Sequence, residues 1–317
     1  MGYGAPPSMS DLERHYASNS HIRATRNIQQ VYTSKYMPVE FDPSKMKLPR
    51  EARDSNENPN SRGIIFACDL TGSMDIFLMD LIQNEVPRLI RNTFESVQYD
   101  PQICFMGFGD VAARDDAPLQ VTQFETDIRI LQQLQNIYVE RGGGGNRYES
   151  YILPWYFAAN HISMDCFEKR GKKGFLFTFG DEEPTPKLTK DEIKTVFGEN
   201  SSLDQTLITS EEMLEIVSEK FYCYHIMLHA HNYDYNVVKE WKNLLGSHVC
   251  DLSNHHYLPE LIATILKMYE GKSKEDAILD INDLRGRSVV EKALSQHEDM
   301  VEDVVVDNGK NTSFEII

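Results

Sequence analysis

The segment Asp69-x-Thr71-x-Ser73 presents one carboxylate and two hydroxyls at alternate positions. It directly follows the apolar run at 63–68, which is typical of a fully buried strand in a parallel sheet. Hard cations such as Mg²⁺ prefer oxygen ligands, which a tight loop can bring to one point. Open α/β sheets also place their ligands at the ends of parallel strands. The segment therefore predicts a divalent-cation site where a strand ends and a helix begins.

Two further oxygen-rich segments lie near predicted strand ends. One is the glycine run at 142–145 with Asn146 and Glu149 after it, and the other is Asp181, which follows the apolar run at 174–179. Glycines let the backbone turn with positive φ and approach a ligand closely. Because right-handed crossovers bring the ends of parallel strands to one rim, we expect the three segments to converge. They predict one site in which hydroxyls bind the cation directly and carboxylates bind through water.

The elements that must position this site alternate between strand and helix from residue 61 to residue 270. This alternation favours a doubly wound, mostly parallel sheet with helices on both faces. The predicted strands are 64–68, 103–108, 174–179, 221–228 and 248–252, with an edge strand at 119–124. The predicted helices are 76–94, 128–137, 148–161, 190–197, 210–219, 235–245 and 258–269.

The segments on either side of this core differ from it. Residues 1–60 read as an extension that is helical at 21–36 and otherwise irregular. Residues 271–317 read as helices followed by an acidic tail, with one helix at 273–284 and a second that opens at Ser288. A hairpin at 304–310 and a disordered tail are equally favoured for the last segment.

Bulk composition excludes several classes of protein. The 317 residues are 41% hydrophobic and carry a formal net charge of −17, so nucleic acid and anionic membranes are poor candidates as partners. No apolar run approaches the roughly 20 residues that span a bilayer, and we expect no signal peptide. The five cysteines form no Cys-x-x-Cys pair, which favours reduced thiols and a cytoplasmic location.

The order of these motifs resembles a von Willebrand factor type A domain with its metal-ion-dependent adhesion site. The resemblance covers roughly residues 61–270. It implies a Rossmann-like sheet of six strands with one antiparallel edge strand. It also implies Mg²⁺, or Mn²⁺ or Ca²⁺, bound so that an acidic residue of a partner protein completes its coordination. Asp69, Thr71, Ser73 and Asp181 match the ligand positions, with Thr71 in place of the more usual serine.

The glycine-rich loop departs from that family pattern. The family commonly has a threonine after the glycines, whereas this chain has Gly145 or Asn146 there. Asn146 and Glu149 are the nearest oxygen donors, and both remain candidate ligands. The loop and the segment 107–110 are similar to prokaryotic and phage variants, including adaptors encoded beside MoxR-like AAA+ ATPases. The resemblance therefore implies a cation-dependent adaptor with an AAA+ ATPase as a possible partner.

Two other functions stay open. The same oxygens could polarise a phosphoryl group in a metal-dependent hydrolase. The chain shows no Ser-His-Asp or Gly-x-Ser-x-Gly signature, however, so we do not expect an enzyme. The domain could instead be a metal-free structural protein that assembles through its extensions. The histidines at 255 and 256 lie in a predicted loop without zinc-motif spacing, which disfavours a histidine metal site.

Overall fold

The computed structural model describes residues 10, 11 and 14 and residues 28–139, 148–201, 204–229 and 234–297. The glycine run at 142–145, the candidate ligand Asn146 and the hairpin expected at 304–310 lie outside these residues. Residues 21–27 of the helix expected at 21–36 also lie outside them, and the described remainder, 28–36, contains helix α3 (Ile28–Val31).

The centre of the molecule is a six-stranded sheet in the order β12-β11-β7-β2-β3-β4. Five strands are parallel, and β4 pairs antiparallel with β3 at one edge. The mixed α/β class and the mostly parallel sheet are therefore as predicted. The strands are β2 (Ser61–Asp69), β3 (Asp100–Phe108), β4 (Leu119–Val121), β7 (Gly174–Gly180), β11 (Phe221–Leu228) and β12 (Val249–Leu252).

Each central strand is buried on both of its faces. In β2, Ile64 and Phe66 point into one hydrophobic core, whereas Ile65 and Ala67 point into the other. Successive side chains of a strand alternate between faces, so a strand between two layers of helices must be apolar at every position. This requirement explains the unbroken apolar runs in the sequence.

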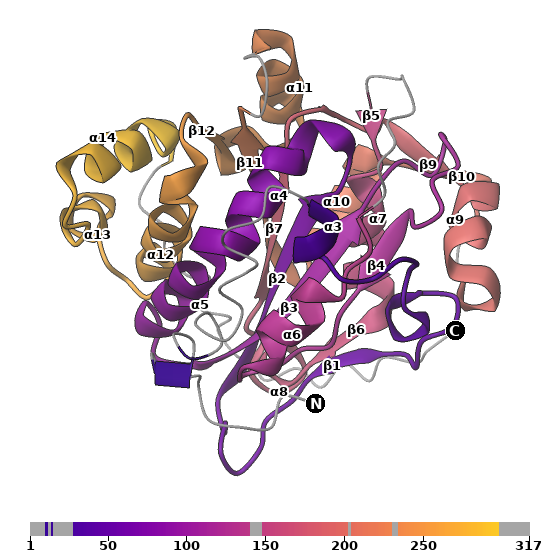
Figure 1. Cartoon of the computed structure of the whole chain (residues 1–317), viewed down its shortest axis with the longest axis horizontal. Coiled ribbons are helices and arrows are strands. Elements are labelled where there is room, and N and C mark those ends of the chain that lie inside the picture. Colours follow the sequence, from indigo (N-terminus) through magenta and orange to yellow (C-terminus); the bar gives the residue numbers. More distant parts are fainter. Residues whose placement is uncertain are drawn as a thin grey trace, which may run out of the picture.

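Helices cover both faces and complete the two cores, as Figure 1 shows. The first face carries α3, α4 (Asp75–Asp80), α5 (Val86–Glu95), α6 (Arg129–Gln135), α12 (Leu258–Tyr269), α13 (Lys274–Leu279) and α14 (Leu284–Ala293). The second face carries α7 (Ile152–His161), α8 (Asp165–Arg170), α9 (Lys190–Phe197), α10 (Ser210–Ser218) and α11 (Tyr235–Leu245). In Figure 1, α5, α12, α13 and α14 lie on one side, and α7, α9 and α10 on the other.

Two predicted helices differ from the observed ones, and both differences affect residues of the candidate sites described below. The helix expected at 76–94 is interrupted by the π-helical segment η3 (Leu81–Glu85) between α4 and α5. The helix expected at 148–161 begins only at Ile152. The residues before it form β5 (Tyr148–Glu149), which pairs in parallel with β8 (Glu183–Pro184) just after β7.

The C-terminal helices also differ from the expected boundaries. The first ends at Leu279, and the second begins at Leu284 rather than near Ser288. Asp283 starts it, because its side chain accepts hydrogen bonds from the backbone N–H groups of Arg285 and Gly286. Hydrophobic side chains of both helices belong to the first core.

Besides β5 and β8, four more short strands lie outside the main sheet in the described part of the chain, and none of them was predicted. They pair as β1 with β6 in parallel and β9 with β10 antiparallel. Their bounds are β1 (Arg50–Ala52), β6 (Ile162–Met164), β9 (Lys187–Thr189) and β10 (Leu207–Thr209). Within the described ranges, no helix combines the length and apolar character needed to cross a bilayer.

Candidate metal centre at the ends of β2 and β7

The loops after β2 and β7 leave the sheet at a topological switch point. From β2 the chain proceeds to β3 on one side, and from β7 it proceeds to β11 on the other. Because β2 and β7 are neighbours, the two loops start side by side and lead in opposite directions. Open α/β sheets bind ligands at this position, which we call the crevice. Asp69 ends β2, and Asp181 directly follows β7.

Asp69 organises the first loop. Its Oδ1 accepts hydrogen bonds from the backbone N–H of Thr71 at 2.8 Å and from the Thr71 hydroxyl at 2.7 Å. Asp69 is completely buried, and Thr71 is 5% exposed. The carboxylate thus fixes both the turn and the direction of the hydroxyl proton. The lone pairs of Thr71 Oγ1 are left facing away from Asp69.

Ser73 joins the first loop to the second. Its hydroxyl donates a 2.8 Å hydrogen bond to Oδ1 of Asp181. The hydroxyl oxygens of Thr71 and Ser73 lie 3.4 Å apart, although each hydroxyl already has a carboxylate as acceptor. The structure therefore brings together Asp69, Thr71, Ser73 and Asp181, the four residues predicted from the first and third segments.

The spacing of these oxygens suits a small hard cation. Neighbouring ligands of an octahedral Mg²⁺ with bonds of about 2.1 Å lie about 3.0 Å apart. The two hydroxyl oxygens that would bind the cation directly, those of Thr71 and Ser73, lie 3.4 Å apart, which is close to that value. Since both hydroxyl protons are directed to carboxylates, both hydroxyl oxygens can donate electron pairs to a cation while the carboxylates hold its waters.

The electrostatics of the crevice favour a positive charge. Burial, together with the nearby negative charge of Asp181, raises the pKa of Asp69 to about 7, although its hydrogen bonds from Thr71 act to lower it. Burial also raises the pKa of Glu149 to about 9, with additional contributions from the negative charges of Asp69 and Asp110. Carboxylates crowded in a low-dielectric site resist ionisation unless a cation compensates them.

Glu149 comes to the crevice through the pairing of β5 with β8. Its backbone carbonyl accepts a hydrogen bond from the Thr185 hydroxyl, and the residue is 5% exposed. Its Oε2 is buried and has no hydrogen-bond partner within the part of the chain that the structure describes. An orphaned buried carboxylate oxygen beside Asp69 fits the requirements of a cation or its water. The other candidate of this loop, Asn146, is outside the described residues.

Tyr151 supports the site and was not identified from the sequence. Its hydroxyl donates to Oδ2 of Asp69 at 3.3 Å and accepts from the backbone N–H of Glu182 at 3.3 Å. A Cβ built on Gly180 would lie 1.8 Å from this hydroxyl, so only glycine leaves room for it. The sequence signal that was available is the glycine itself, placed between a buried strand and an aspartate.

Three aromatic side chains pack around the ring of Tyr151 and fix its position. Its ring packs edge-on against Phe108, Trp241 and His225, at centroid distances of 4.9, 4.9 and 5.3 Å. Trp241 also donates from Nε1 to the carbonyl of Glu182 at 2.9 Å, which anchors the loop after β7. His225 is fully buried and stacks on Trp241, so it serves packing rather than metal binding.

A third loop closes the crevice on the β3 side. The Ser150 hydroxyl accepts from the backbone N–H of Val111 at 3.0 Å and donates to Oδ1 of Asp110 at 3.3 Å. Asp115 Oδ2 accepts from the backbone N–H of Asp110 at 2.7 Å. These bonds fix Asp110 and the segment around Glu149 next to each other. Asp110 thus adds a negative charge to the rim and does not supply a third hydroxyl ligand.

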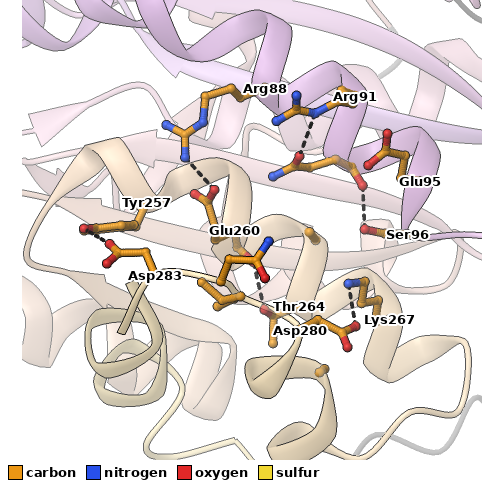
Figure 2. A pocket seen from close by; sticks show the side chains of 15 residues that line it. Arg88, Arg91, Glu95, Ser96, Tyr257, Glu260, Thr264, Lys267, Asp280 and Asp283 are labelled. Atoms are coloured by element: carbon orange, nitrogen blue, oxygen red, sulfur yellow. Dashed lines mark hydrogen bonds and ion pairs between the residues drawn. The ribbon is translucent and has the colours of Figure 1, made fainter. Parts of the chain in front are cut away.

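The chain also has a cleft away from this rim, of ≈ 640 Å³, between α5 and the helices α12 and α13. Figure 2 shows that two of its cationic side chains point at acidic ones, since Arg88 pairs with Glu260 and Lys267 with Asp280. Arg91 donates instead to the side-chain carbonyl of Asn92. The paired charges give the cleft no preference for a ligand of either sign, so we assign it no function.

Comparison with known proteins gives no family for the chain. No family model matches it, and no curated protein matches it. Among solved structures, the open conformation of the pilus adhesin SpaC from Lactobacillus rhamnosus GG matches with 11% identity and a TM-score of 0.47. That alignment covers 68% of this chain and 31% of the adhesin. A second structure of the same adhesin gives 9% identity and a TM-score of 0.42, over 71% of this chain and 31% of the adhesin.

The chain thus spans less than a third of the adhesin that it matches. At these identities and TM-scores, the similarity carries no argument about the function of this chain.

These findings correct the family predicted from the sequence. Membership among von Willebrand factor type A proteins of the MoxR-associated type is not supported: no family model or curated protein matches, and the matching structures are described as a pilus adhesin. The physical reason is that the motifs are short. A carboxylate followed by hydroxyls after a strand is also an ordinary way to start a helix. The AAA+ ATPase partner was expected from that resemblance alone, so it is no longer supported.

Proposed function

We propose that this protein is a divalent-cation-dependent protein-binding module. Mg²⁺ would be held at the rim by the hydroxyls of Thr71 and Ser73 and, through water, by Asp69 and Asp181. An acidic side chain of a partner protein would complete its coordination. The observation that carries the proposal is the convergence of these four side chains from two separate loops, with oxygen–oxygen distances of 2.7 to 3.4 Å.

The exposure of the site supports binding of a partner. Asp69 is completely buried, whereas Ser73 and Asp181 are half-buried. A cation bound between the hydroxyls would therefore have protein oxygens on its inner side and solvent on its outer side. Neutral hydroxyl ligands leave a divalent cation with much of its charge, so it would attract a carboxylate to the outer side.

Tyr151, which contacts the candidate ligands, is a poor candidate for a catalytic residue in hydrolysis. Its hydroxyl already hydrogen-bonds to Asp69 and to the backbone of Glu182. Burial keeps the pKa of Tyr151 well above its ordinary value, which disfavours its use as a nucleophile. We therefore favour binding over catalysis. The five buried, unpaired cysteines support a cytoplasmic location as part of the same proposal.

The first test is metal binding by the complete chain. Isothermal titration with Mg²⁺ and Mn²⁺ is expected to give saturable binding that Asp181→Asn and the double variant Thr71→Val with Ser73→Ala weaken at least tenfold. Proton relaxation of water around bound Mn²⁺ is expected to show exchangeable water on the ion, because the outer side is open. Absence of saturable binding, with the fold intact by circular dichroism, would remove the cation from the proposal.

The second test is partner binding. Proteins from the source cell are captured on the immobilised chain in Mg²⁺, washed and then released with EDTA. A partner released by EDTA, and not captured by the Asp181→Asn chain, is expected to lose binding when one of its own acidic residues is changed to the amide. Binding that survives both EDTA and Asp181→Asn would show that recognition does not use the metal.

A further inference from the structure

A second cluster of metal-binding side chains lies outside the rim already described. His255 Nε2 is 2.6 Å from Oδ2 of Asp80, and His256 Nδ1 is 3.1 Å from the same oxygen. His256 Nδ1 is also 2.9 Å from Oε1 of Glu85. The ligand atoms of Asp80, His255 and His256 all lie within 4.8 Å of one another. We propose that Asp80, Glu85, His255 and His256 bind a divalent transition metal, with Zn²⁺ as the representative ion.

The π-helical segment η3 is what brings the two carboxylates together. Asp80 and Glu85 are five residues apart, and in a regular α-helix such residues point about 140° away from each other. The segment Leu81–Glu85 is π-helical, and the N–H of Val86 bonds to the carbonyl of Leu81 five residues before it. This wider turn places both carboxylates on the side that faces the histidines. Such π-helical interruptions of α-helices occur frequently at functional sites.

The two histidines come from the turn between β12 and α12. They begin the short helix η6 (His255–Tyr257), and the side chain of Asn254 accepts from the backbone N–H of His256 at 3.1 Å. The ring of His255 packs edge-on against Phe77 at 5.8 Å. The cap and this ring contact fix the direction of the imidazoles toward α4 and η3.

Each carboxylate turns one oxygen to the histidines and the other to a hydrogen-bond donor. Asp80 accepts from the Asn84 side chain at Oδ1, and Glu85 accepts from Arg88 Nη1 at Oε2, at 2.6 Å. Arg88 also donates to the carbonyl of His256 at 3.1 Å. Figure 2 shows the pairing of Arg88 with Glu260. Outer hydrogen bonds of this kind orient carboxylates as ligands through a single oxygen.

The donor set selects the class of metal. Two imidazole nitrogens with two carboxylate oxygens suit Zn²⁺ and its neighbours, whereas Mg²⁺ and Ca²⁺ prefer oxygen alone. Tetrahedral ligands at about 2.0 to 2.2 Å from Zn²⁺ lie about 3.3 to 3.6 Å apart. The three donor pairs given above are 2.6 to 3.1 Å apart, so a bound ion requires these pairs to move apart by less than about 1 Å. Glu85 lies outside the group whose ligand atoms are all within 4.8 Å of one another, so its side chain must also move toward the ion. A bound metal would tie α4 and η3 to the turn before α12.

The test is titration of the complete chain with Zn²⁺ and with Co²⁺, whose visible absorption reports four-coordinate nitrogen and oxygen ligands. We expect about one tight equivalent that excess Mg²⁺ does not displace. The double variant His255→Ala with His256→Ala, and the isosteric Asp80→Asn, are expected to weaken binding more than about tenfold. His229→Ala is the matched control, because His229 is a histidine that pairs with a carboxylate, Asp251, and neither residue belongs to this cluster.

The outcomes of the titration distinguish the presence of the metal site from its absence. Retained affinity in His229→Ala with loss in the other two variants supports the site. Failure of the wild-type chain to bind Zn²⁺ or Co²⁺, or unchanged affinity in the double variant, overturns it. Circular dichroism and thermal unfolding of each metal-free variant identify any chain that has lost its fold. If the double variant is unfolded, Asp80→Asn decides the result.

Discussion

The hydroxyl of Ser73 donates to Oδ1 of Asp181 at 2.8 Å, although 108 positions of the sequence separate the two residues. This contact joins the loop after β2 to the loop after β7 at the switch point of the sheet. It also directs the hydroxyl proton to the carboxylate, so the oxygen that remains can accept a cation. The proposed function depends on this relationship more than on any single residue.

Asp69→Asn is expected to separate metal binding from stability. The amide keeps the shape of the side chain and its acceptor for Thr71, but it removes a buried charge near Asp181. We expect the metal-free variant to melt at the same temperature as the wild type or higher. Mg²⁺ at 100 times its dissociation constant stabilises the wild type by about 2.7 kcal/mol, and the variant should lose this response. Differential scanning calorimetry with and without Mg²⁺ measures both effects.

The control for that experiment is Asp191→Asn, which changes an exposed aspartate at the start of α9. It should keep the full Mg²⁺ response. If Asp69→Asn also kept it, Asp69 would have no part in binding the ion.

Gly180→Ala is expected to destabilise the fold through Tyr151. The new Cβ would lie 1.8 Å from the tyrosine hydroxyl and 2.6 Å from Cζ, so the ring must move out of its aromatic cluster. Overpacking of this kind costs about 1 to 3 kcal/mol or more in the free energy of unfolding. Urea denaturation of Gly180→Ala, Tyr151→Leu and the double variant measures the coupling.

The double variant should lose less stability than the sum of the two single variants, because Tyr151→Leu removes the atoms that clash. Additive losses would mean that Gly180 is needed for a reason other than room for Tyr151.

The two histidines that are buried in neutral form are expected to lower the free energy of unfolding as the pH decreases from 7 to 5, whereas the raised pKa values of Asp69 and Glu149 act in the opposite direction. Burial lowers the pKa of His161 to about 4 and that of His297 to about 3. The unfolded chain binds protons near pH 6.5, so below that pH it takes up protons that the folded chain does not. Each histidine should therefore remove about 1 to 2 kcal/mol between pH 7 and 5.

His161→Phe tests this account directly, since the ring lies among Tyr156, Phe157 and Phe197. Relative to the wild type, the variant should gain about 1 to 2 kcal/mol of unfolding free energy as the pH decreases from 7 to 5. An identical slope in the two proteins would show that His161 is not a source of the pH dependence.

The capping box at the start of α9 is expected to stabilise the chain measurably. Thr189 Oγ1 accepts from the backbone N–H of Glu192, whose carboxylate accepts from the backbone N–H of Thr189. Thr189→Ala removes the first bond and should cost about 1 kcal/mol in urea denaturation. Thr195→Ala is the control within the same helix, because Thr195 is exposed and bonds only to the preceding turn, and it should be neutral. Equal effects at the two positions would contradict a role of the cap.

Local sequence was sufficient to predict the alternation of strands and helices. The strands of the main sheet are apolar runs because both of their faces are buried, and a requirement at every position is visible without a structure. The candidate ligands Asp69, Thr71, Ser73 and Asp181 could be named for the same reason, since they follow directly on such runs. The short strand pairs were missed because their residues are too few to show a period.

The family prediction failed because a five-residue motif contains too little information to specify a lineage. The second cluster was missed for a different reason. Asp80 and Glu85 point apart in any regular helix, and only the π-helical turn places them together beside His255 and His256.

The sequence alone determined which segments are buried on both faces, and therefore the class of fold and the loops that carry the candidate oxygen ligands. Only the tertiary structure decided the order of the strands, and with it the neighbouring positions of β2 and β7 that bring Ser73 to Asp181. The reason is that burial is a property of each residue and leaves a local pattern. Which strands lie side by side depends on the free energy of packing the whole chain, which no segment records by itself.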